Sequence, residues 1–270
     1  MFYEGTGGAG LYRPPEGYRE NLRGLLFEDA ARVLEAEDHF YARVLSSRLY
    51  LYGNSPQIAV KESHAARRIH RRQVEEGWAH DDETAGMAVN HLEACIAAES
   101  TTSVGPADLA ATEEAYRDTF KVYVPNRATA DKLGKAKALY HLSRGEHEKA
   151  LIATDETFND DLWPATPKDI DAILLRSVAH HHLRDRASAV ESLQFAASSM
   201  RHNETSSQLV RALLLAITSV AADLIRDGDC EQWALDCLGG MGIPDRSALS
   251  VIGYARNRLS RSHPVDPLLP

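Results

Sequence analysis

The densest run of basic side chains in this sequence lies at residues 67–72, in a stretch of helical composition. The basic residues of the run, with the histidine one turn before it, are His64, Arg67, Arg68, Arg71 and Arg72. Residues three or four apart share one face of a helix, so these side chains can act together. Guanidinium groups bind phosphates and carboxylates through paired hydrogen bonds. The run is therefore a candidate binding site for a phosphate group or an acidic partner.

Two other interpretations of the run stay open at this point. Glu75 and Glu76 follow the last two arginines by four residues, a spacing at which opposite charges pair along a solvated helix. Contact with RNA is the other interpretation. The formal net charge of −9 argues against a general nucleic-acid binder, because phosphate contacts need clustered positive charge. We expect a protein or peptide partner.

Histidines offer few arrangements that could hold a metal ion. Successive residues on a helix point about 100° apart, so the side chains of His180, His181 and His182 cannot converge on one ion. His147 and Glu148 begin a zinc-protease motif that lacks its second histidine. We predict no metal ligand and no cofactor.

Nucleophilic catalysis has no recognisable motif either. The chain contains no Gly-x-Ser-x-Gly, and Cys95, Cys230 and Cys237 lie in helical, apolar surroundings that favour unreactive thiols. An odd number of cysteines without a Cys-x-x-Cys pair indicates a reducing compartment, so we expect a cytoplasmic location. The N-terminus resembles no signal peptide. The most apolar run, 209–225, carries charges and is predicted to be a buried helix.

Helices must position all of these side chains, because apolar residues recur at three- and four-residue spacing along most of the chain. We divide it into a Gly/Pro-rich tail at 1–17, an N-terminal helical region at 18–125, helical repeats at 126–262 and a Pro-rich tail at 263–270. The predicted fold class is all-α, with about ten to twelve helices in antiparallel pairs that form a short α-solenoid or an irregular helical array.

Local signals predict several helix ends in the N-terminal region. A break is expected at 37–39, where charged residues interrupt the apolar pattern. Gly53 is expected to take the left-handed position after a helix. Ser55 is predicted to cap the next helix, and Pro56 suits its first position.

A duplicated pattern spans residues 134–200. Each half contains an amphipathic helix rich in small residues, a short polar turn and a second helix that opens on an alanine. The two alanines, Ala150 and Ala189, are 39 residues apart. Repeats of this kind indicate an array of helical hairpins.

The features of this pattern resemble those of the tetratricopeptide repeat superfamily. The resemblance rests on the turn glycine Gly145, on the two alanines, and on small residues in the first helices, Ala138 and Ser177. Arg184 replaces the turn glycine in the second copy. The resemblance implies a scaffold that binds a protein or peptide along a concave face. Tyr140 and His180 are further candidate binding residues in this part of the chain.

The sequence favours a non-enzymatic helical-repeat module for protein–protein interaction. One alternative is an immunity protein that neutralises a basic toxin, since an acidic helical chain would complement its charge. Another is a helical metal-dependent hydrolase that uses His64, His80, Asp81 and Asp82. Metal analysis of the purified protein would distinguish the hydrolase from the other two.

Overall fold

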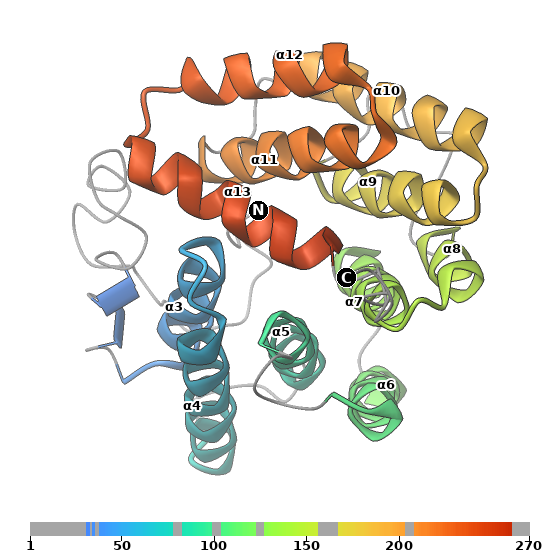
Figure 1. Cartoon of the computed structure of the whole chain (residues 1–270). Coiled ribbons are helices and arrows are strands. Elements are labelled where there is room, and N and C mark those ends of the chain that lie inside the picture. The colour runs from blue at the N-terminus through green and yellow to red at the C-terminus, as the bar shows by residue number, and fades with distance from the viewer. Residues whose placement is uncertain are drawn as a thin grey trace, which may run out of the picture. The chain divides into compact units, whose positions relative to one another are not determined.

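The computed structural model describes residues 31, 32, 34, 35, 38–77, 83–98, 104–122, 127–155, 167–202 and 208–260. This part of the chain contains eleven named helices and no strand, which confirms the all-α class (Figure 1). The chain forms two compact units. The N-terminal unit holds the described residues up to Leu133 and the segment Ile243–Ser250, and the C-terminal unit holds Gly134–Gly242 and the described residues from Val251 onward.

Four helices build most of the N-terminal unit. They are α3 (Phe40–Tyr52), α4 (Pro56–Glu75), α5 (Thr84–Ala97) and α6 (Pro106–Val122). Helix α3 packs on both α4 and α5, and α5 packs in turn on α4 and α6. Phe40, Val44, Ala66, Ile69 and Met87 form a buried cluster between α3, α4 and α5. The predicted break at 37–39 is confirmed, because the side chain of His39 caps α3.

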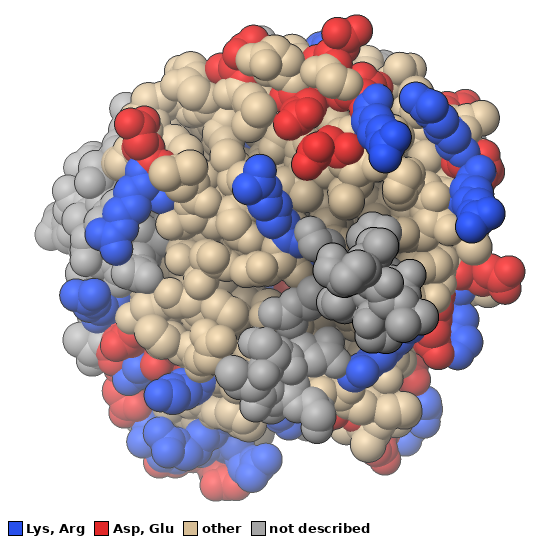
Figure 2. Space-filling model, in the orientation of Figure 1, with Lys and Arg blue, Asp and Glu red and all other residues tan. Residues whose placement is uncertain are grey.

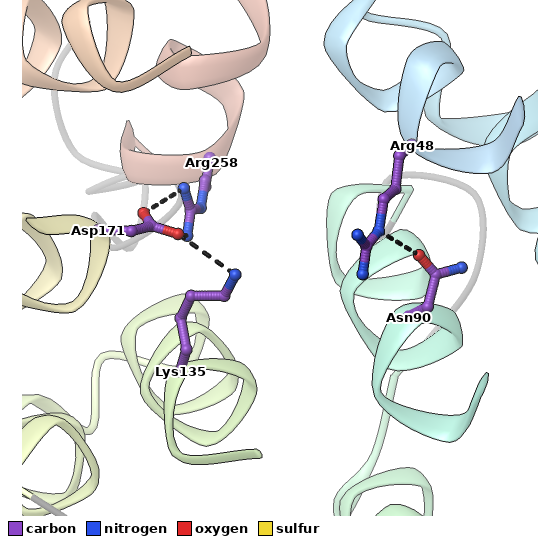
Figure 3. Close-up of polar contacts among 5 residues, drawn as sticks. All are labelled: Arg48, Asn90, Lys135, Asp171 and Arg258. Carbon is purple, nitrogen blue, oxygen red and sulfur yellow. Dashed lines mark hydrogen bonds and ion pairs between the residues drawn. The ribbon is translucent and has the colours of Figure 1, made fainter. Parts of the chain in front are cut away.

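A chain of buried polar contacts joins α3, α4 and α5. Arg48 Nε donates to Asn90 Oδ1 at 3.3 Å (Figure 3). Asn90 Nδ2 in turn donates to Ser47 Oγ at 3.4 Å. Ser47 Oγ then donates to the carbonyl oxygen of Ala59 at 2.8 Å. Polar groups buried in this way must be paired to avoid a desolvation cost, so the chain helps to set how the three helices align.

The C-terminal unit contains most of the remaining helices. They are α8 (His147–Asp155), α9 (Pro167–His182), α10 (Arg186–His202), α11 (Gln208–Ile225) and α12 (Gly228–Gly239). Helix α9 contacts α8, α10 and α11, while α11 also packs on α10 and α12. Two further helices, α7 (Arg127–Ser143) and α13 (Asp245–Ser260), each begin in the N-terminal unit and end in the C-terminal one.

Within the C-terminal unit, residues of α7, α9 and α13 form a buried ionic cluster (Figure 3). Arg258 of α13 donates from both terminal nitrogens to the carboxylate of Asp171 on α9, at 2.7 and 3.0 Å. Lys135 Nζ of α7 lies 3.3 Å from Asp171 Oδ2. Burial alone would raise the pKa of Asp171, but the charges of Arg258 and Lys135 outweigh it and hold that pKa below its usual value.

Four helical hairpins share one turn geometry. The backbone N–H of the residue that opens the second helix bonds to the carbonyl five residues earlier, which satisfies carbonyls at the end of the first helix. These bonds are Ser55 to Tyr50, Glu146 to His141, Asp185 to His180 and Asp227 to Ala222, at 2.8 to 3.0 Å. The residue before each opener has a positive φ: Asn54, Gly145, Arg184 and Arg226 have φ of 60°, 70°, 63° and 63°.

The shared turn corrects two expectations and extends the repeat. Gly53 does not take the left-handed position, because its φ is −73° and Asn54 takes that position instead. Ser55 is the N-cap residue of α4, as predicted, but its side chain does not make the expected cap hydrogen bond. Five residues after the left-handed position, Ala59, Ala150 and Ala189 are all fully buried. The 39-residue spacing read from the sequence therefore marks equivalent positions of two hairpins.

The shared turn geometry predicts how a substitution of Arg184 changes the stability of the protein. A side chain with a Cβ is strained at a φ of 63°, and glycine takes this conformation freely in the preceding hairpin, at Gly145. We expect Arg184→Gly to raise the free energy of unfolding by about 0.5 kcal/mol, measured by urea denaturation. Gly145→Ala is the matched control and should lower it by about 1 kcal/mol. A less stable Arg184→Gly variant would contradict the turn assignment.

Helix α11 is the described helix that is long and apolar enough to cross a membrane by length and composition, although 61% of that window is buried inside the fold. Its neighbours are α9, α10 and α12. The burial agrees with the prediction of a buried helix at 209–225, because helices of a protein core meet the same compositional test.

Candidate functional site

Helix α4 presents two chemically different faces. Ala59, Ser63, Ala66, Ile69 and His70 are buried on the side packed against α3 and α5. Most of the side chains on the opposite face are exposed to solvent, as the amphipathic spacing predicts. The basic run predicted from the sequence therefore lies on a helix whose opposite face anchors it in the N-terminal unit.

The exposed basic side chains of α4 are Lys61, His64, Arg67, Arg68, Arg71 and Arg72. We call this set the basic face. Figure 2 shows basic side chains gathered over the lower end of α4 in the view of Figure 1, with acidic side chains among them. The run at 67–72 thus places all four of its arginines in solvent.

Only part of the basic face is neutralised within the described residues. Arg72 lies 2.6 Å from Asp38 and 3.9 Å from Glu76, so the predicted pairing along the helix is confirmed for this arginine. The hydrogen bond and charge of Asp38 raise the pKa of Arg72. Arg67, Arg68 and Arg71 form no ion pair with any described residue. Three guanidinium groups are thus available for an external anion.

A second cluster lies beneath the basic face, around His91 of α5. The ring of His64 lies 4.2 Å from the ring of His91, centroid to centroid. Ser63 Oγ lies 2.8 Å from His91 Nδ1, and Cys95 Sγ lies 3.5 Å from His91 Nε2. Ser63 Oγ also donates to the carbonyl oxygen of Val60 at 2.7 Å. Because a hydroxyl has one hydrogen, we assign the proton of the serine–histidine bond to His91 Nδ1.

Burial keeps His91 neutral at physiological pH. It lowers the pKa of His91 to about 4, and the charges of His64 and Arg67 act in the same direction. Burial likewise raises the pKa of Cys95 to about 11. The cluster is a poor nucleophile, because the Ser63 hydroxyl is only 1% exposed and already donates to backbone, while the thiol stays protonated.

The other candidate binding residues lie in the C-terminal unit. Tyr140 is 5% exposed and its ring faces the Arg144 guanidinium at 5.6 Å, so it offers little surface to a partner. His180 Nδ1 lies 3.4 Å from Asp185 Oδ2, across the hairpin turn. His141 and Glu146 form the equivalent contact in the preceding hairpin, at 2.7 Å. These histidines belong to the turns.

The three consecutive histidines at 180–182 also connect two helices. His182, at the end of α9, stacks on His147 of α8 with ring centroids 4.5 Å apart. The ring of His181 meets that of His182 edge-on. In the described part of the chain, no three histidine, cysteine or acidic side chains are arranged to hold a metal ion. His80, Asp81 and Asp82 lie outside the described residues.

Two features of the site escaped the sequence analysis. His91 and Cys95 are four residues apart on α5, a spacing that marked a shared face. The contact of His91 with Ser63 joins residues 28 positions apart, for which a single sequence offers no signal. The three cysteines are free thiols.

Comparison with known proteins yields no relative for this chain. No protein-family model, no curated protein and no solved structure matches it significantly.

Proposed function

We propose that this protein is a non-enzymatic binding module built from helical hairpins, and that it holds another protein against the basic face of α4. One observation carries the proposal. Arg67, Arg68 and Arg71 are exposed, and none of them is neutralised by a described residue, although the chain has a net charge of −9. Charged groups left uncompensated on one face supply steering and specificity for a partner of complementary charge.

The hairpin construction supports this proposal. Four hairpins with the same turn geometry are consistent with a repeat scaffold similar to that of tetratricopeptide proteins. Scaffolds of this kind expose rows of helices whose outward side chains are free to vary, and they commonly use them to bind other proteins. Helix α4 is the second helix of such a hairpin, and its outward face carries the uncompensated arginines.

Site-specific photo-crosslinking in cells tests the proposal. A photoreactive residue placed at Lys61, at the edge of the basic face, should yield a discrete crosslinked product. Reversing two charges, with Arg68→Glu and Arg71→Glu, should reduce that product by about 10-fold or more, since close charge pairs in an interface contribute more than 1 kcal/mol each.

A matched variant controls for the change in net charge. Arg184→Glu with Arg186→Glu alters the formal charge by the same amount, and both side chains are exposed in the C-terminal unit. This variant should retain the product. Equal loss in both variants, or no loss in the α4 variant, would rule out the basic face as the contact surface.

A further inference from the structure

We propose that the partner presents a short acidic helix, which lies along α4 from Ile58 to Arg71. This inference rests on the proposed function and names the chemistry of the partner. Lys61, His64, Arg68 and Arg71 follow one another at spacings of three, four and three residues, and all are exposed. A helix that carries carboxylates at the same spacing places one against each basic group.

The two ends of the basic face set the length of the partner segment. Ile58 is a large apolar side chain, 40% exposed, at the start of α4. Glu75 and Glu76 are exposed beyond the arginines, and Asp38 lies on Arg72. From Ile58 to Arg71 the helix rises about 20 Å. An acidic helix of about four turns, with one apolar residue toward Ile58, fits between these ends.

Charge complementarity favours carboxylates over a polynucleotide. A nucleic acid that extended past Arg71 would bring its phosphates toward Glu75 and Glu76 and toward a chain of net charge −9. A short acidic helix ends before it reaches these residues. Arg68 and Arg71, which have no counter-charge among the described residues, can each receive a carboxylate in a bidentate contact.

Fluorescence anisotropy with synthetic peptides and the full-length protein tests the inference. The probe is an 18-residue alanine-based peptide with one leucine and with glutamates at spacings of three, four and three. The first comparison peptide replaces every glutamate by glutamine, and the second spreads the glutamates evenly around the helix. An 18-nucleotide single-stranded RNA is the third probe. We expect the patterned peptide to bind about 10-fold more tightly than the glutamine peptide and about 3-fold more tightly than the spread peptide.

Each outcome decides between the two proposals. Stronger binding of RNA than of the patterned peptide overturns the acidic-helix inference, as does binding that is indifferent to the glutamate pattern. If the crosslinked partner at Lys61 persists while the peptide fails to bind, the proposed function stands and the inference falls. If neither partner nor peptide depends on Arg68 and Arg71, both fall.

Discussion

Replacing Asp171 with asparagine is expected to lower the free energy of unfolding of the C-terminal unit by about 3 to 5 kcal/mol. The carboxylate of Asp171 accepts two hydrogen bonds from Arg258 and faces Lys135, and the side chain of Arg258 is only 6% exposed. The neutral amide leaves the guanidinium buried without its counter-charge. Hydrogen exchange of amides in α9 and α13 would measure the loss.

The control for this prediction is an exposed pair in the same unit. Asp155 lies 3.4 Å from Arg176 and is 58% exposed, so Asp155→Asn should change the stability by no more than about 0.5 kcal/mol. Combining Asp171→Leu with Arg258→Met and Lys135→Met should recover part of the stability, because apolar groups replace the buried charges together. If Asp171→Asn behaves like Asp155→Asn, the cluster does not stabilise the unit.

The second prediction is that the N-terminal unit loses stability at acidic pH. The pKa of His91 is lowered to about 4, whereas an unfolded histidine titrates near 6.5, so the unfolded chain binds this proton first. The contribution of His91 to the free energy of unfolding is therefore fully present above about pH 6.5, and it is lost as the pH drops toward 4. After a discount for partial exposure of the ring, we expect a loss of about 2 to 3 kcal/mol over this window.

Hydrogen exchange of α4 and α5 amides at several pH values would measure the loss. The His91→Gln variant should show a flatter dependence in the same window, because its side chain can donate to Ser63 but does not titrate. Above pH 7.5 the free energies of unfolding of the wild-type protein and the variant should differ by a constant amount, which serves as the internal control. An equally steep fall in the variant would assign the acid sensitivity to other groups.

Local signals account for the parts of the fold that the sequence predicted. The helix ends at Phe40 and Pro56 follow from residues beside them, and the opposed faces of α4 follow from apolar spacing. Gly53 was the error in this group. Glycine is favoured in the left-handed position, but asparagine tolerates it too, and the bond from Ser55 to Tyr50 places Asn54 there.

Contacts between helices account for what the sequence could not predict. The exposure of the basic face followed from helical periodicity, whereas the neutralisation of Arg72 by Asp38 joins residues 34 positions apart. The ionic cluster joins Asp171 and Arg258 across 87 positions. A single sequence marks such residues only as charged, and charged residues are usually solvated, so their burial emerges only when the helices pack.

The hairpin turn bears on how a chain of this kind can change over time. Glycine, asparagine and arginine all occupy its left-handed position, while the backbone bond and the buried alanine stay in place in three hairpins. Side-chain identity at the turn can thus diverge widely without altering the path of the main chain. Proteins built from such hairpins can diverge until no sequence similarity is detectable, and they can still gain or lose whole hairpins.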